Sequence, residues 1–276
     1  MEPREPAYVC GHSSRELERL EVQARIYGDF TRRALVSAGV APGMRVLDVG
    51  CGVGDVSVLA ADLVGGAGRV DGVDRAAEAI DAATRRASAE GRANVRFIRT
   101  ELDRFESGAR YDAVVGRFVL MHQRSPAALL ASARDWLRPG GCVVFVESDI
   151  RSCVRGVHSR PHAETYQRIV DAWMGIIGAA GAHLDMGSRL AATFEAAGLP
   201  PPTIAVDRYE SGDPDGPIFR FAIESLRSML PLAAGAGVAA PAEREMDELY
   251  ARLLTEVTTK RGVIAAPPAF AAWARV

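Results

Sequence analysis

Three glycines at alternate positions, Gly50, Gly52 and Gly54, follow a short apolar run and precede a helical pattern; residues 46–55 read VLDVGCGVGD. In a strand, turn and helix of this kind, glycine lets the backbone approach a ligand closely, because it adopts dihedral angles closed to other residues. Open parallel sheets bind their ligands at the carboxyl ends of the strands, which is where this turn falls. The segment therefore predicts a ligand site at the end of the first strand.

The spacing of the glycines argues against a pyrophosphate ligand. The dinucleotide fingerprint is G-x-G-x-x-G, and the position of its third glycine is taken here by Asp55. A carboxylate at a helix N-terminus competes with pyrophosphate for the same partial positive charge. A ligand with a sulfonium and an amino acid but no phosphate meets no such conflict, so we expect a ligand of that kind.

Acidic residues after the next two predicted strands fit the rest of a nucleoside. Asp74 ends the strand over 69–74, twenty residues after Gly54, where its carboxylate can accept hydrogen bonds from both ribose hydroxyls. Glu101 and Leu102 follow a third strand and are placed to meet the edge and face of an adenine ring.

Short β-branched runs alternate with amphipathic helical stretches between residues 43 and 148, which predicts a parallel sheet covered by helices on both faces. The flanks are mainly helical, and neither a repeat nor a low-complexity linker divides them from the α/β core. We therefore expect a single domain over residues 1–276. Its parts are an N-terminal helical lid over 1–40, a cofactor-binding core over 41–150, and substrate-side helices and last strands over 151–276. The strands are expected over 45–49, 69–74, 94–100, 111–117, 142–148, 202–210 and 269–275, and the flanking helices over 14–39, 162–180, 188–197, 217–229 and 241–260.

Composition excludes several classes of protein. The 33 basic and 35 acidic residues of the 276 nearly cancel, so bulk charge gives no reason to expect a nucleic-acid partner. Four cysteines without a Cys-x-x-Cys pair do not form a disulfide framework, and no cluster has metal-ligand spacing, so we expect no metal. Without a basic, then apolar leader or an apolar run of about 18 residues, we expect a cytoplasmic protein and no membrane partner.

Five motifs in order resemble the class I S-adenosylmethionine-dependent methyltransferases. They are VLDVGCGVG, Asp74, FIRTE at 97–101, YDAVVGRFVLMH at 111–122 and LRPGGCVVFVES at 137–148. Within that family the chain is similar to the ubiquinone/menaquinone-methylase-like branch, which acts on small molecules. The motifs cover about residues 45–148, and the flanks 8–40 and 184–200 fit more loosely. The resemblance implies a Rossmann-like α/β fold: a seven-stranded, mostly parallel sheet with helices on both faces and extra helical lid segments.

The resemblance also implies a cofactor site for S-adenosylmethionine, with S-adenosylhomocysteine as product. Glu101 departs from the branch, in which this acidic residue is commonly aspartate, and its longer side chain changes the geometry of the adenine contact. The implied contacts are Asp48, Gly50, Cys51 and Gly52 with the methionyl part, Asp74 and Arg75 with the ribose, Glu101 and Leu102 with adenine, and Arg117 and Phe118 at the methionyl end.

Methyl transfer from a sulfonium is an in-line displacement, so the enzyme chiefly aligns its reactants, and it needs a general base only if the acceptor must lose a proton. His122 and Glu147 lie near the ends of the fourth and fifth strands and are the candidate catalytic residues. Tyr8, Tyr27 and Trp173, in the flanks, are candidate contacts for a small, partly apolar acceptor.

Three functional hypotheses are to be weighed. We expect methyl transfer to an O, N or C atom of a small molecule, of the kind found in secondary metabolism. The alternative is an enzyme of the same fold that binds the cofactor but catalyses a cyclisation or another reaction, and formation of S-adenosylhomocysteine separates the two. A non-catalytic binding protein would require a degraded glycine loop, and this loop is intact. The helical N-terminus is a lid or a dimer arm, which leaves a homodimer open.

Overall fold

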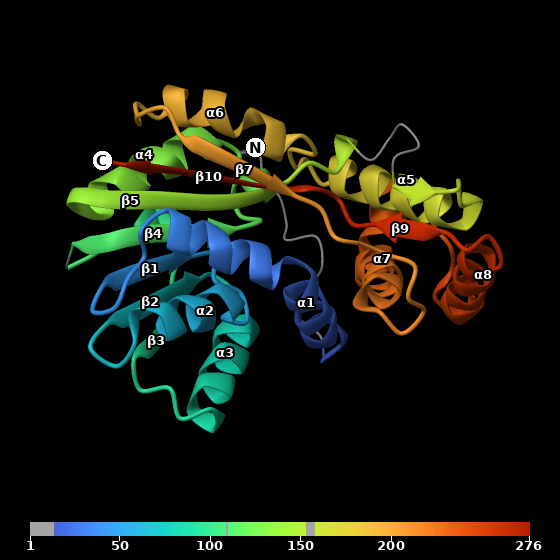
Figure 1. Cartoon of the computed structure of the whole chain (residues 1–276), viewed down its shortest axis with the longest axis horizontal. Coiled ribbons are helices and arrows are strands. Elements are labelled where there is room, and N and C mark those ends of the chain that lie inside the picture. The colour runs from blue at the N-terminus through green and yellow to red at the C-terminus, as the bar shows by residue number, and fades with distance from the viewer. Residues whose placement is uncertain (1–13, 109, 153–157) are drawn as a thin grey trace. The chain divides into compact units, whose positions relative to one another are not determined.

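The structure is a computed structural model, and it describes residues 14–108, 110–152 and 158–276 (Figure 1). The chain forms two compact units, each of which is described by itself. The sheet unit comprises Gly28–Glu147, Met186–Val206 and Phe270–Val276, and the helical unit comprises Met1–Tyr27, Ser148–Asp185 and Asp207–Ala269.

The sheet unit is built on seven strands in the order β3-β2-β1-β4-β5-β10-β7 (Figure 1). The register shows β1 to β5 running parallel, which confirms the predicted seven-stranded, mostly parallel sheet. Strand β1 is an almost continuous apolar run, and Val46, Leu47 and Val49 are fully buried in it, as expected for a strand covered on both faces. The strands are β1 (Arg45–Val49), β2 (Arg69–Asp74), β3 (Val95–Arg99), β4 (Tyr111–Arg117), β5 (Leu137–Ser148), β7 (Thr203–Asp207) and β10 (Ala269–Arg275).

Helices pack along this sheet. Helices α2 (Asp55–Val64) and α3 (Ala77–Ala89) contact β1, β2 and β3, whereas α4 (Pro126–Trp136) contacts β4, and α6 (Met186–Ala196) contacts α4. Two short 3-10 helices, η1 (Leu102–Arg104) and η2 (Leu120–His122), follow β3 and β4. These turns carry predicted site residues to the carboxyl ends of their strands.

Two strands differ from their predicted bounds. Strand β5 begins at Leu137, which pairs with Tyr111; the pairing then resumes at Cys142 opposite Ala113, so the Pro-Gly-Gly turn is an irregularity within the strand. The strand predicted over 202–210 is two strands, because only β7 joins the large sheet, while β8 (Glu210–Ser211) pairs with β9 (Val263–Ala265) in a separate one.

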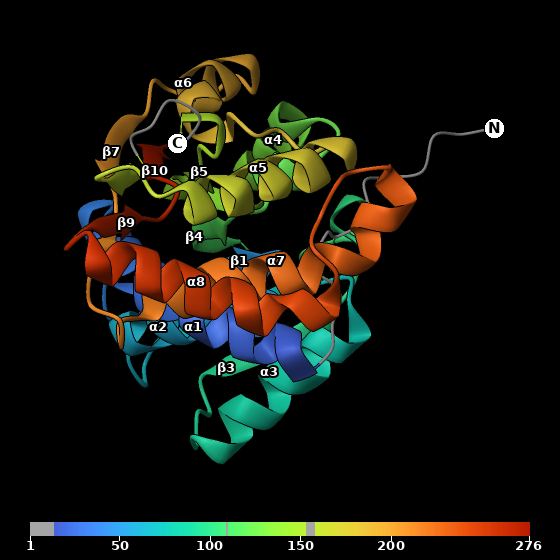
Figure 2. The same ribbon diagram turned by 90° about the vertical axis from the view of Figure 1, so that its right-hand side faces the viewer.

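The helical unit contains three helices that contact one another, α5 (Glu164–Ala179), α7 (Pro217–Ala236) and α8 (Met246–Thr259) (Figure 2). A three-stranded sheet, β6-β9-β8, accompanies them, with β6 formed by Ser159–Arg160. Helix α7 extends beyond its predicted end at residue 229 and runs through Pro231, because Met229 and Ala233 stay buried on one face. Helix α8 begins at Met246, after the 3-10 turn η4 (Glu243–Glu245). Helix α1 (Ser14–Ser37) contributes residues to both units.

Within the described ranges, no helix combines the length and the apolar character that crossing a membrane requires.

Candidate cofactor site

The carboxyl ends of β1, β2 and β3 lie level with one another. Asp48 is opposite Gly72, and Asp74 is opposite Arg99, so the residues that follow each strand emerge at the same edge. Two backbone hydrogen bonds extend this pairing, from Cys51 to the carbonyl of Val73 at 3.0 Å and from Thr100 to that of Asp74 at 2.9 Å. The fold therefore brings the glycine turn, Asp74 and the segment that begins at Glu101 to one edge.

Each glycine of the turn has a positive φ: 64° at Gly50, 53° at Gly52 and 85° at Gly54. A Cβ at Gly54 would lie 2.6 Å from the Phe97 ring, and one at Gly50 would lie 2.7 Å from the side chain of Val119. A Cβ at Gly52 would meet nothing within 4 Å. At Gly50 and Gly54 both the neighbouring side chains and the backbone conformation exclude a larger residue, whereas Gly52 has open space beside it.

Asp74 ties the glycine turn to the start of α3. Its Oδ2 accepts the backbone N–H of Gly52 at 2.9 Å, and its Oδ1 accepts that of Ala76 at 2.9 Å. A carboxylate has about four lone-pair positions, so each oxygen can still accept a hydroxyl. The side chain that we predicted to bind ribose is therefore fixed in place by backbone donors.

Asp48 is buried beneath the same turn, and the Ser57 hydroxyl donates to its Oδ2 at 2.6 Å. Burial raises its pKa to about 7, against the opposing effects of the Ser57 hydrogen bond and the nearby Arg117 charge. Ser57 was not among the predicted site residues. The signal that could have found it is the aspartate inside an apolar strand, because a buried carboxylate needs a donor.

Asp55, the first residue of α2, is paired with two arginines. Its Oδ1 accepts from Arg86 of α3 at 2.6 Å, and its Oδ2 accepts from Arg117 at the end of β4 at 3.3 Å. From the sequence we expected the Asp55 carboxylate to carry an unpaired negative charge that competes with pyrophosphate. The structure corrects that premise, because two guanidinium groups offset the charge, so the identity of the ligand rests on other grounds.

Glu147, at the end of β5, is fully buried and accepts three consecutive backbone N–H groups. Its Oε1 accepts those of Val119 and Leu120 at 2.9 and 2.8 Å, and its Oε2 accepts that of Met121 at 3.2 Å. Burial raises the pKa of Glu147 to about 7, although these three donors favour the charged form. Both oxygens are thus engaged in holding the η2 turn, on which His122 is the last residue.

The remaining predicted cofactor contacts lie at the same ends of the strands. Glu101 is exposed and precedes η1, Leu102 is half-buried as the first residue of η1, and Arg75 is exposed directly after Asp74. Phe118 follows Arg117 with a φ of 56°, and its N–H donates to the carbonyl of Val146 at 2.8 Å.

Comparison with known proteins gives the family of the chain. The family model described as a methyltransferase domain matches residues 41–198, more than half of the chain. The chain belongs to the class I S-adenosylmethionine-dependent methyltransferases. Its cofactor is S-adenosylmethionine.

Two curated relatives match the chain over part of their length. The aklanonic acid methyltransferase DauC of Streptomyces sp. (strain C5) is 30% identical over 141 residues, which are 51% of this chain and 63% of that protein. The ubiquinone biosynthesis O-methyltransferase of Shewanella pealeana is 31% identical over 125 residues, 44% of this chain and 51% of that protein. The chain therefore spans less than two thirds of these relatives.

Among solved structures, the [4+2]-cyclase SpnF is similar, with a TM-score of 0.52 and 17% identity over 88% of this chain and 80% of that one. At this identity the likeness shows the fold alone. The predicted Rossmann-like methyltransferase fold is confirmed.

Two of the three predicted acceptor contacts, Tyr27 and Trp173, are buried in the helical unit. Tyr27 donates its hydroxyl to the carbonyl of Pro267 at 3.0 Å, and its ring meets Phe221 edge-on with the centroids 6.0 Å apart. Trp173 packs edge-on against both Phe221 and Tyr166. Tyr8 lies outside the described residues. Their acceptor-binding role stays a prediction, and the two described residues also form part of an aromatic core.

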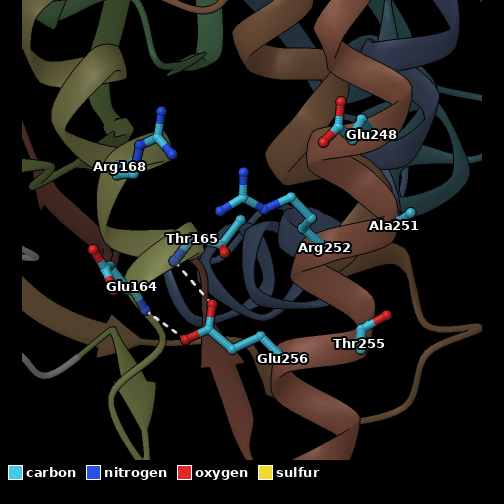
Figure 3. A pocket seen from close by; sticks show the side chains of 8 residues that line it. All are labelled: Glu164, Thr165, Arg168, Glu248, Ala251, Arg252, Thr255 and Glu256. Atoms are coloured by element: carbon cyan, nitrogen blue, oxygen red, sulfur yellow. Dashed lines mark hydrogen bonds between the residues drawn. The ribbon is translucent and has the colours of Figure 1, made fainter.

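A pocket of about 480 Å³ lies between α5 and α8 of the helical unit (Figure 3). On its wall, Glu256 accepts the N–H groups of Glu164 and Thr165 at 2.8 and 2.9 Å and pairs with Lys260 at 2.7 Å. Although burial alone would raise the pKa of Glu256, these partners lower it to about 2. None of the predicted cofactor or catalytic residues lines this pocket, so its lining differs from that of the predicted cofactor site at the ends of β1, β2 and β3. It is lined by Glu164, Thr165, Arg168, Glu248, Ala251, Arg252, Thr255 and Glu256.

Two buried carboxyls with raised pKa values, Asp48 and Glu147, predict how the stability of the protein depends on pH. The pKa of Glu147 and that of Asp48 are raised from below 5 to about 7 in the folded chain, so folding favours their protonated forms. This contribution is fully present below the unfolded pKa values and is lost as pH rises through 7. We expect the free energy of unfolding to fall between pH 5 and pH 8, by at most about 3 kcal/mol for each group.

Urea unfolding at several pH values checks this, with Glu147→Gln as the comparison. The variant cannot titrate at this position, so its stability should fall less steeply with pH than that of the wild type. A wild-type stability that is flat or rises from pH 5 to 8 would contradict the expectation.

Proposed function

We propose that this chain transfers the methyl group of S-adenosylmethionine to a small, partly apolar molecule. The observation that carries the proposal is the pre-formed edge at β1 and β2, where Asp74 holds the open-sided Gly52 in place. A nucleoside with two adjacent hydroxyls fits a carboxylate fixed in this way, because both of its oxygens keep unused lone pairs. The family to which the chain belongs supports the same ligand.

The site residues take the roles predicted from the sequence. Asp74 and Arg75 bind the ribose, Glu101 and the backbone of Leu102 bind adenine, and Arg117 and Phe118 border the methionyl end. The backbone of Gly50, Cys51 and Gly52, above the buried Asp48, holds the methionyl part itself. The donor set fits, because Asp74 offers carboxylate oxygens to the ribose hydroxyls, the glycine turn offers backbone groups to the ammonium group, and the guanidinium of Arg117 balances the charge of the cofactor's carboxylate.

When bound, the cofactor supplies an electrophilic methyl group. The chain's own contribution is chiefly to orient the reactants, which can be worth about 7–11 kcal/mol of the barrier. His122 is placed on the η2 turn, which Glu147 and three backbone N–H groups fix. We propose His122 as the general base where the acceptor must lose a proton, with Glu147 holding the turn that carries it.

Calorimetry with S-adenosylmethionine, S-adenosylhomocysteine and NADH tests the cofactor assignment. We expect both adenosyl ligands to bind and NADH not to bind. Incubation with S-adenosylmethionine and a library of small apolar acceptors then tests for S-adenosylhomocysteine as product. Binding and turnover of an acceptor without that product would support a cyclisation or another reaction, and tight binding of NADH alone would overturn the proposal.

The names of two relatives support the proposed class of acceptor. One is named for aklanonic acid and another for ubiquinone biosynthesis, which supports a small organic acceptor and a role in secondary metabolism. We also propose that the protein works in the cytoplasm, without nucleic acid or membrane partners, and with a homodimer as the assembly to test.

Replacing His122 by alanine should lower turnover far more than cofactor affinity. A general base contributes about 10²- to 10⁴-fold, so kcat for an acceptor that is deprotonated should fall by that order. The dissociation constant for S-adenosylhomocysteine should change by less than about threefold, because the predicted cofactor contacts come from other residues. Steady-state kinetics and calorimetry measure the two effects, and an unchanged kcat would remove His122 from the mechanism.

A further inference from the structure

Two arginines face each other across the pocket between α5 and α8. Arg168 reaches into the pocket from α5 and Arg252 from α8, and their side chains point toward one another (Figure 3). Both side chains are exposed, and within the described ranges neither makes an ion pair or a hydrogen bond. Like charges that face each other repel, so an anion between the two guanidinium groups would stabilise this arrangement.

The nearest glutamates in the sequence do not neutralise these arginines. Each arginine follows a glutamate by four residues on its own helix, Glu164 before Arg168 and Glu248 before Arg252. This spacing commonly allows an ion pair on a helix surface. The side chain of Glu164 instead points away from the pocket (Figure 3), and no ion pair joins Glu248 to Arg252 in the part of the chain that the structure describes. Both guanidinium groups are therefore available to a ligand.

Glu256, on the wall of the same pocket, has its charge taken up within the protein. Its carboxylate accepts the N–H groups of Glu164 and Thr165, the first residues of α5, and pairs with Lys260 at 2.7 Å. It thus occupies the N-terminus of α5, and its negative charge is offset by these donors. An anion that enters the pocket would meet the two guanidinium groups as its partners.

We infer that this pocket binds the phosphate group of a small organic molecule between Arg168 and Arg252. A guanidinium presents its donors as a planar fork that matches pairs of phosphate or carboxylate oxygens, and a phosphate group has enough oxygens for two forks. The volume of about 480 Å³ lies within the range of small-molecule sites, about 300–1,000 Å³, so the pocket has room for more than the phosphate itself. The small side chains of Ala251 and Thr255 line the α8 wall, where the organic part would lie.

Calorimetry at constant ionic strength tests the inference with matched probes. Glucose 6-phosphate and glycerol 3-phosphate carry the phosphate on an organic body, glucose and glycerol lack the phosphate, and inorganic phosphate lacks the body. We expect at least one of the two esters to bind with a dissociation constant of about 1 mM or tighter, because two charge-assisted contacts have this worth. Inorganic phosphate should bind more weakly than that ester, and glucose and glycerol should show no binding.

Variants of the two arginines locate the site. Arg168→Gln and Arg252→Gln should each weaken binding of the ester about tenfold. Arg168→Lys keeps the charge but loses the fork, so it should also weaken binding, whereas a general effect of surface charge would leave it unchanged. Arg220→Gln is the matched control, because it removes an exposed arginine of α7 that does not line the pocket. This control should bind the ester as the wild type does.

The contrary results are distinct. A wild type that binds no phosphate probe, or an equal loss in Arg220→Gln and Arg168→Gln, would overturn the inference. Inorganic phosphate that binds more tightly than both esters would mean an adventitious ion only. Malonate that binds more tightly than both esters would indicate a dicarboxylate site and overturn the assignment to phosphate. Each variant should bind S-adenosylhomocysteine as the wild type does, since no predicted cofactor contact lines the pocket, so these results leave the proposed function standing.

Discussion

Replacing Asp74 by alanine should weaken binding of S-adenosylhomocysteine by at least about 100-fold. Two effects combine in this change. The ribose loses its carboxylate acceptor, and hydrogen bonds to a charged group are worth about 1.5–3 kcal/mol each. The N–H groups of Gly52 and Ala76 lose the oxygens that they now bind, so the turn is no longer tied to the start of α3.

Isothermal calorimetry measures this effect, with two comparison variants. Asp74→Asn keeps one oxygen and should lose less affinity than Asp74→Ala. Asp81→Asn removes an exposed carboxylate from α3, the helix that begins just after Asp74, and should bind as the wild type does. If Asp74→Ala binds S-adenosylhomocysteine within about threefold of the wild type, the ribose assignment is wrong.

Replacing Glu147 by alanine should have the largest effect on folding among the residues of the site. The change leaves three backbone N–H groups without acceptors in a buried turn, and each such group costs about 1–3 kcal/mol. We expect the free energy of unfolding to fall by about 3–5 kcal/mol, since partial relaxation or an entering water recovers some of the loss. Urea unfolding at pH 7 measures this difference.

Glu195→Ala is the control for this measurement, because it removes an exposed carboxylate from α6 in the same unit and should change stability by less than about 0.5 kcal/mol. Glu147→Gln separates support of the turn from proton transfer. Its amide oxygen can replace Oε1, but its NH₂ group faces the N–H of Met121, so we expect an intermediate loss of stability and a lower kcat. If the free energy of unfolding of Glu147→Ala equals that of the wild type, the turn does not depend on this carboxylate.

The common edge at which β1, β2 and β3 end could be predicted from the sequence. The glycine turn, Asp74 and Glu101 each follow directly on a strand, and neighbouring parallel strands end at a common edge. Local patterns of hydrophobic residues were therefore enough to predict the sheet and to bring these residues together. The ends of elements were less predictable: α7 continues through Pro231 because tertiary packing outweighs the helix-breaking tendency of proline.

Hydrogen-bond partners that are distant in the sequence could not be predicted from local patterns. Glu147 bonds to residues 26 to 28 positions earlier, and Arg117 bonds to Asp55 across 62 positions. We predicted Glu147 as a catalytic group from its place at a strand end, and only the structure shows that this carboxylate is fully buried and accepts three N–H groups of the η2 turn. By itself, then, the sequence determined the family, the sheet and the common edge at which we propose that the cofactor binds, because those depend on local spacing. The tertiary structure alone decided which charges are paired, buried or left over, because that depends on which strands and turns become neighbours.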